Sequence, residues 1–199
     1  MVRRNWFALI ASIFMFATVA SSLSSPWWRM QIGSDLVTIN ADPFFTSFNV
    51  LGVSHTIQII FALNIGTIAL FIAGGIALIV YTAKPTESYS EQLLSFGWKR
   101  SLHVTIGFIG ILALSLYAMP IAINAIAPDI IAPTPIAPLI GSSTIRLSSS
   151  ILNIHAEVAI ITTTTFTHSF FLGVAAAALS IAARMYHHRM LSAGNAEKA

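Results

Sequence analysis

Histidines are the residues of this chain with the most evident capacity for chemistry, because imidazole binds haem iron and other metals. His55 and His168 begin two long apolar segments, and His103 and His187 lie at the opposite ends of such segments. Two pairs of axial imidazoles on a four-helix bundle would suit a di-haem cytochrome, so these four residues are candidate haem ligands. All four stand at segment ends, however, and His168 and His187 are separated by about 28 Å of helix. Interfacial histidines are therefore the preferred interpretation.

A second constellation is His155 with Glu157, which share one face of a strand because strand side chains alternate. Imidazole and carboxylate together suit zinc or copper. The sequence fixes no third ligand, so a solvated strand face is the preferred interpretation and no metal is expected. The chain has no cysteine, which excludes a thiol nucleophile and a thiolate metal site. It also has no glycine-rich phosphate loop, HExxH or GxSxG motif, so we expect no enzymatic activity and no cofactor.

The elements that carry these residues are predicted to lie in a membrane. Of the 199 residues, 56% are hydrophobic and 9% are charged, whereas a soluble domain has about 25% charged residues. Four segments are long enough to cross a hydrocarbon core of about 30 Å: residues 6–23, 56–83, 102–127 and 166–185. None has the polar face of a helix in a soluble protein. The prediction is one domain over residues 1–199, an all-α bundle of four transmembrane helices.

The distribution of positive charge predicts the orientation. One side of the predicted bundle carries Arg3, Arg4, Lys84, Lys99, Arg100, Arg184, Arg189 and Lys198, and the other carries Arg29 and Arg146. The positive-inside rule then places both termini in the cytoplasm of a cell-membrane protein, with residues 24–55 and 128–165 outside. A cleaved signal peptide is the rival interpretation of the first segment. No small-x-small site closes that segment before Pro26, so a retained anchor is preferred. The net charge is only +3 and the basic residues are not clustered on one face, so they do not indicate nucleic-acid binding.

Both outer segments show strand patterns. Residues 28–32 alternate between apolar and polar side chains, a turn cluster follows at 33–35, and residues 36–39 favour strand, which together predict a hairpin. Residues 143–147 and 151–160 are predicted as two strands around a turn at Ser148–Ser150, and residues 162–165 continue the strand-favouring pattern. A lone hairpin is marginally stable in water. We therefore expect the two outer segments to pair in one small antiparallel sheet above the bundle.

The remaining connections carry three further expectations. A short amphipathic helix on the membrane surface is predicted in residues 84–100, ending near Gly97. Asn64, deep in the second segment, is expected to form an interhelical hydrogen bond. The repeated Ile-Ala-Pro of residues 127–141 predicts an extended apolar loop that touches lipid or another protein. The candidate interaction residues are Trp27, Trp28, Arg29, Ile131, Pro133, Pro135, Ile136 and Pro138.

The start of the first outer segment resembles a known family. Residues 26–29 read Pro-Trp-Trp-Arg and residues 36–38 read Leu-Val-Thr, in the order and near the spacing of the first extracellular segment of claudins. The chain therefore resembles the claudin and peripheral myelin protein superfamily. The resemblance implies four spans, a β-hairpin with Trp28 at the sheet–membrane junction and Arg29 beside it, and lateral association. The family's Gly-Leu-Trp motif and outer cysteines are absent, and residues 44–52 occupy that region.

The function expected from these observations is a non-enzymatic membrane scaffold or adhesion-type protein. Its outer β-cap and apolar loop would bind copies of itself or a larger membrane complex. An accessory, haem-binding subunit of a membrane oxidoreductase is the alternative, and a small channel or transporter is the third hypothesis.

Overall fold

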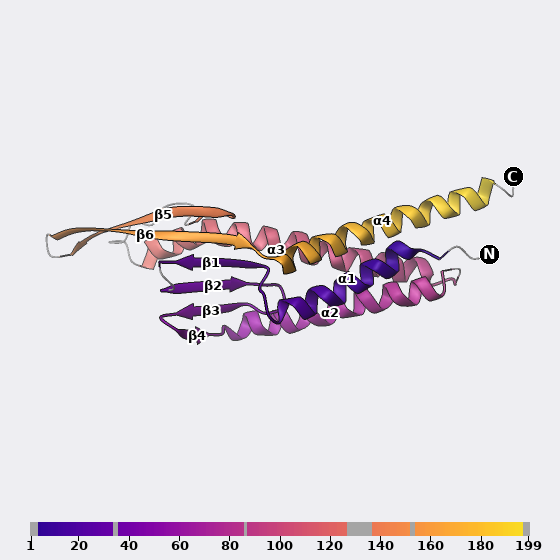
Figure 1. Cartoon of the computed structure of the whole chain (residues 1–199), viewed down its shortest axis with the longest axis horizontal. Helices are drawn as coiled ribbons and strands as arrows, with labels where there is room; N and C mark the ends of the chain where they lie inside the picture. Colours follow the sequence, from indigo (N-terminus) through magenta and orange to yellow (C-terminus); the bar gives the residue numbers. More distant parts are fainter. Residues whose placement is uncertain (1–3, 34–35, 86, 127–136, 152–153, 197–199) are drawn as a thin grey trace.

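The computed structural model describes residues 4–33, 36–85, 87–126, 137–151 and 154–196, which form four helices and six strands. In chain order these are α1 (Trp6–Ser22), β1 (Trp28–Ile32), β2 (Val37–Ala41), β3 (Ser47–Val50), β4 (Val53–His55), α2 (Gln58–Ala83), α3 (Ser90–Ile126), β5 (Gly141–Ile151), β6 (Ile154–Phe166) and α4 (His168–Ala196). Helices α1, α2 and α4 lie at one end with both termini, the strands lie at the other, and α3 extends from the helices along the sheet (Figure 1). The expected mostly helical fold with one antiparallel sheet is confirmed at this level.

Three of the helices are long and apolar enough to cross a membrane. They are α2, residues 90–118 of α3, and residues 168–190 of α4. The fourth, α1, is apolar but shorter, with 17 residues. It runs antiparallel to α4, because the Asn5 amide donates to the Ala183 carbonyl at 2.7 Å near one end and the Ser21 and Ser169 hydroxyls lie 2.7 Å apart at the other.

The prediction of a separate surface helix ending near Gly97 is wrong. Helix α3 begins at Ser90 and continues without a break to Ile126. A Cβ at position 97 would lie 2.5 Å from Cγ of Leu78 and 3.0 Å from the carbonyl oxygen of Gly74, both on α2. Gly97 therefore allows α2 and α3 to approach closely and does not end a helix.

The six strands form one antiparallel sheet in the order β4-β3-β2-β1-β6-β5. Strand β1 pairs with β2 on one side, Trp28 opposite Ala41, and with β6 on the other, Trp28 opposite Phe166. The predicted pairing of the two outer segments in one sheet is thus confirmed. Strands β3 and β4 were not predicted. They are joined by Leu51 and Gly52, which both have positive φ (52° and 82°), the geometry of a tight hairpin turn.

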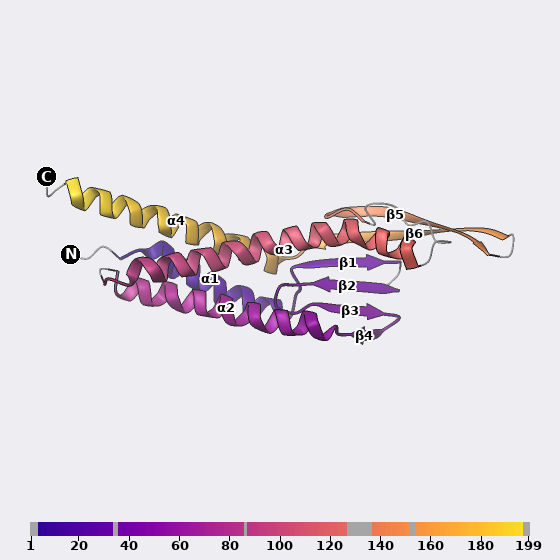
Figure 2. The ribbon, with the colours of Figure 1, turned by 180° about the vertical axis from the view of Figure 1, so that it is seen from behind.

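The hairpin of β5 and β6 differs from the prediction. Ser148–Ser150 do not form a turn; they belong to β5, and the last pair before the connection is Ile151 opposite Ile154. The paired register with β1 ends at Ile32 opposite Thr162. Beyond that pair the hairpin projects past the other strands (Figures 1 and 2).

Helix α3 covers one face of the sheet, as Figures 1 and 2 show from opposite sides. Trp28 and Met30 of β1 pack there against Leu112 and Leu116 of α3. A second cluster fills the helix bundle and includes Trp27. The two cores meet at the start of β1.

Candidate functional site: the sheet and the groove beneath it

Trp27 lies at the junction between the helices and the sheet. Its ring contacts those of Phe44, Phe108 and Phe170 edge-on, with centroids 5.2–5.8 Å apart, and its Nε1 donates to the Ser22 hydroxyl at 3.1 Å. The side chain is completely buried. A Cβ on Gly173 of α4 would lie 2.5 Å from the indole, so this glycine makes the space that the ring occupies.

Trp28 and Arg29 point to opposite faces of β1. Trp28 is buried toward α3 and its Nε1 donates to the Leu139 carbonyl at 2.8 Å. Arg29 is exposed on the other face, where its Nε donates to Oδ1 of Asn40 at 3.1 Å. Asn40 donates in turn to the Ser47 hydroxyl at 3.3 Å. Polar side chains therefore connect three strands across the face turned away from α3.

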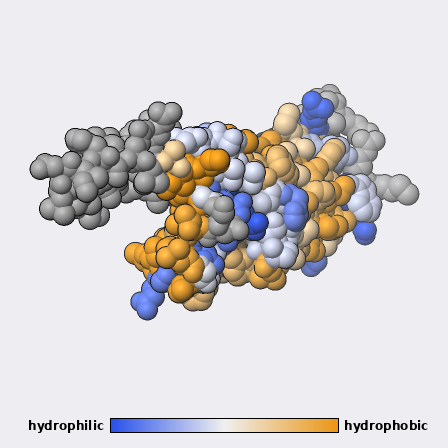
Figure 3. Space-filling model, turned by 60° about the vertical axis from the view of Figure 1, so that its left-hand side comes forward, coloured by the Kyte–Doolittle hydropathy of each residue, from blue (hydrophilic) through white to orange (hydrophobic). Residues whose placement is uncertain are grey.

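This polar face contrasts with the helices. In Figure 3 hydrophilic residues gather in the middle of the view, where the sheet lies, and hydrophobic residues cover much of the helical part beyond. Exposed apolar side chains on α2 alone include Ile59, Phe61, Leu63 and Ile65.

The predicted apolar loop is described only at its end. Ile131, Pro133, Pro135 and Ile136 lie outside the described residues. Pro138 is half-buried, and its carbonyl accepts a hydrogen bond from the Thr164 hydroxyl at 2.9 Å. The contact between this loop and a partner stays a prediction. The role of Trp27 and Trp28 in association also stays a prediction, and both side chains are buried within the chain.

The four candidate haem ligands lie on different elements. His55 is in β4, His103 is in the body of α3, and His168 and His187 are in α4. His187 is buried, and its Nδ1 lies 2.9 Å from the hydroxyl of Tyr81. Within the described part of the chain, no three His, Asp or Glu side chains gather as metal ligands would.

The candidate metal pair lies in the projecting hairpin. His155 and Glu157 belong to β6, where their register partners are Ser150 and Ser148 of β5. Both stand beyond the last residue of β6 that pairs with β1. Their side chains lie outside what the structure describes.

Asp42 is a buried polar residue that sequence analysis did not identify as a candidate. Its carboxylate accepts hydrogen bonds from the backbone N–H groups of Trp27, Phe44 and Phe45, at 2.8–3.2 Å, and from the Ser22 hydroxyl. These bonds join the end of α1 to the starts of β1 and of the β2–β3 connection. Burial nevertheless outweighs them and raises the pKa of Asp42 to about 6.

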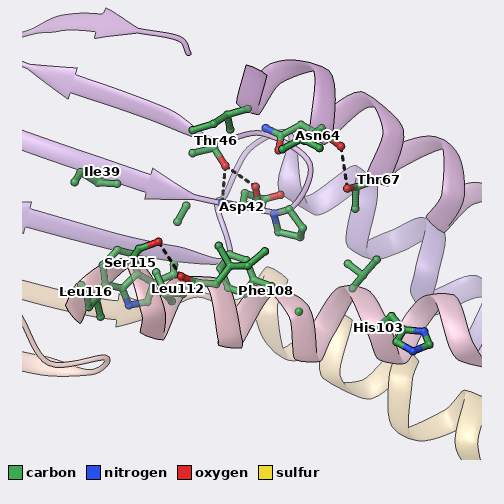
Figure 4. A pocket seen from close by; sticks show the side chains of 18 of the residues that line it. Ile39, Asp42, Thr46, Asn64, Thr67, His103, Phe108, Leu112, Ser115 and Leu116 are labelled. Carbon is green, nitrogen blue, oxygen red and sulfur yellow. Dashed lines mark hydrogen bonds between the residues drawn. The ribbon is translucent and has the colours of Figure 1, made fainter. Parts of the chain in front are cut away.

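An apolar groove of about 480 Å³ runs between α2, α3 and the face of the sheet that carries Trp28 (Figure 4). Helix α3 lines it with one stripe, at positions 100, 103, 104, 107, 108, 111, 112, 115 and 116. This three- and four-residue spacing places all of these residues on one side of a helix. Helix α2 contributes Ile60, Leu63, Asn64, Thr67 and Leu70 at the same spacing.

The polar groups that line the groove mostly bind within the protein. The Ser115 hydroxyl donates to the Ile111 carbonyl and the Thr67 hydroxyl to the Leu63 carbonyl, each inside its own helix. When the Asn64 side-chain amide is oriented so that both its oxygen and its nitrogen form hydrogen bonds, its oxygen accepts one from the Thr46 backbone N–H at 2.9 Å. Its expected interhelical bond is therefore replaced by a bond to the connection between β2 and β3. What the groove offers a ligand is chiefly hydrocarbon.

The groove was missed by sequence analysis, although the stripe on α3 is a signal that could have located one of its walls. Comparison with protein-family models, curated proteins and solved structures finds no match to this chain.

Proposed function

We propose that this protein is a non-enzymatic, four-span membrane protein that associates, with its own copies or with a larger membrane complex, through its sheet. Both termini lie in the cytoplasm and the sheet lies outside the cell in this proposal. The observation that carries it is the pairing of β1 with β6, which merges two connections far apart in the sequence into one sheet. The open edge strand β5 and the projecting hairpin belong to that sheet.

The packing of α1 supports its inclusion as a fourth span. Its 17 residues extend about 26 Å, close to the thickness of a hydrocarbon core. Hydrogen bonds near both ends hold it along α4, which is one of the three long apolar helices. A helix fixed in this way lies at the same depth as its neighbour. We therefore include α1 among the spans.

The claudin-like architecture remains part of the proposal. Trp28 is buried between the sheet and α3, and Arg29 is exposed on the opposite face of β1. The sheet continues past the β1–β2 hairpin with two further strands, β3 and β4. We propose that this chain shares the plan of four helices beneath a sheet.

Edge strands supply the means of association. An edge exposes unpaired backbone N–H and C=O groups that pair readily with another strand. At one edge β4 has only three residues, whereas β5 at the other has 11. The longer edge, on a hairpin that projects from the body of the protein, is the better surface for a partner.

A shortened hairpin tests this function. Because Thr144 pairs with Ile161, residues 145–160 can be replaced by Asn-Gly, which favours a two-residue turn. The pairs between β1 and β6 stay intact. We expect chemical cross-linking in native membranes, followed by electrophoresis, to give higher-mass species with the wild-type protein and monomer with this variant.

A double substitution at the opposite edge, Val53→Lys with Ser54→Lys, is the matched control and should leave the higher-mass species unchanged. Equal cross-linking of the wild-type and shortened proteins would refute association through the hairpin.

A further inference from the structure

The groove between the sheet, α2 and α3 has the properties of a lipid site, and we propose that it binds one membrane phospholipid with an anionic headgroup. The inference rests on the proposed membrane-spanning function, since that is what brings lipid to the groove. Four features of the groove support this assignment: its apolar lining, its length, its lateral opening and its one basic end.

The lining selects a hydrocarbon chain over a polar ligand. Met30 and Ile39 line the groove from the sheet, and Phe108 and Leu112 line it from α3. The hydroxyl and amide groups among them bind the backbone, so they offer a polar ligand little. Buried polar atoms of a ligand would lose hydrogen bonds to water without replacement. A methylene chain loses nothing.

The groove is long and open along its side. Arg100 and Leu116 mark its ends on α3, which are about 24 Å apart along a helix. This exceeds one leaflet of hydrocarbon, about 15 Å. Leu63 and Ile111 line the groove and are 66% and 69% exposed, so they form an open rim. A chain in the bilayer can therefore enter from the side.

The end away from the sheet is basic. Arg100 lines the groove there, and His103 lies one turn further along the same side of α3 (Figure 4 shows His103 at this end). The Arg100 guanidinium lies 4.9 Å from the centroid of the Phe96 ring and forms no ion pair within the described residues. A phosphate placed beside it would gain a charge-assisted hydrogen bond. The geometry thus places the acyl chain toward the sheet and the headgroup on the side of the termini.

Lipid competition tests the proposal directly. Full-length protein in detergent micelles is mixed with equal amounts of phosphatidylglycerol and phosphatidylcholine, and bound lipid is counted by native mass spectrometry. We expect one lipid per chain, with phosphatidylglycerol favoured about fivefold, the factor expected for one basic residue near a headgroup. Arg100→Gln should reduce this preference to less than about twofold. Lys99→Gln, at an exposed position outside the groove, should retain it.

Filling the groove tests the position of the chain. Both Gly107 and Gly66 are helical glycines whose added Cβ would meet no atom within 4 Å, but only Gly107 lines the groove. Gly107→Leu should lower lipid occupancy at least fivefold, about the effect of losing a methylene contact or two, and Gly66→Leu should not. If Gly107→Leu does not fold, Ser115→Phe blocks the groove nearer the sheet.

Equal binding of the two lipids by the wild-type protein, or unchanged occupancy in the filled variants, would overturn the proposal. Cross-linking of the same variants separates this result from the proposed function. Gly107→Leu should lose lipid and keep the higher-mass species, whereas the shortened hairpin should lose those species and keep lipid.

Discussion

Asp42 shows how burial can dominate the electrostatics of a single residue. Three backbone N–H groups and the Ser22 hydroxyl stabilise the carboxylate, yet burial raises its pKa from the usual 3.8 to about 6. The residue joins the end of α1 to the start of β1 and to the β2–β3 connection. Its role is therefore to fix the geometry of the junction, at some cost in stability near neutral pH.

The raised pKa of Asp42 predicts a pH-dependent stability. Between about pH 4 and 6 the folded protein binds the proton more tightly than the unfolded chain, so the free energy of unfolding increases as pH falls. The full effect is about 3 kcal/mol. We expect the midpoint of thermal unfolding of the wild-type protein, relative to that of Asp42→Asn, to rise between pH 7 and pH 4.5. A difference between the two proteins that does not change with pH would contradict this account.

Glycine at position 173 is required by the indole of Trp27. Gly173→Ala would place a Cβ 2.5 Å from that ring, and overpacking of this kind costs about 1–3 kcal/mol. We expect a clear decrease in the thermal unfolding midpoint in detergent. Gly66→Ala is the control, because that site is open and alanine favours a helix by up to about 1 kcal/mol. If Gly173→Ala were as stable as Gly66→Ala, the packing described here would be incorrect.

At the scale of elements, local pattern predicts a strand when one of its faces is buried. The alternation in residues 28–32 matches the burial of Trp28 and Met30, so β1 was predicted correctly. Every residue of β4 is exposed, so this strand has no alternation between buried and exposed positions that a sequence pattern could reflect. Gly97 was read as a helix end because its packing against Leu78 depends on another helix. The first error thus reflects the lack of a buried face, and the second reflects a tertiary contact that a local pattern does not contain.

The register between β1 and β6 can be tested by cross-linking, since the chain has no cysteine of its own. Gln31 lies opposite Thr163. Directly opposed residues have Cα atoms about 5.5 Å apart or less, within reach of a disulfide. We expect Gln31→Cys with Thr163→Cys to form a disulfide on mild oxidation, detected by a mobility shift that reductant reverses.

The control for that experiment shifts one partner by two residues on the same face. Gln31→Cys with Thr165→Cys places the two positions on a diagonal about 7–8 Å long, too far for a disulfide. Oxidation of the shifted pair in preference to the opposed pair would show a different register.

At the scale of the whole molecule, the general plan could be predicted and the groove could not. Hydrophobic length gave the helices, and the marginal stability of a lone hairpin gave the single sheet. The groove depends on how α2 and α3 diverge beneath the sheet, which no segment specifies alone. The stripe from Arg100 to Leu116 indicates a packed face but not that part of it stays open.

The central claim is that the bilayer separates the sheet from the termini and from the connection between α2 and α3. Single cysteines at Ser54 and Thr163 on the sheet and at Ser88 on that connection are all at exposed positions. Labelling of intact cells with a membrane-impermeant maleimide should modify Ser54→Cys and Thr163→Cys, and should modify Ser88→Cys only after permeabilisation. Labelling of Ser54→Cys and Thr163→Cys from opposite sides, or of Ser88→Cys together with both in intact cells, would contradict the account.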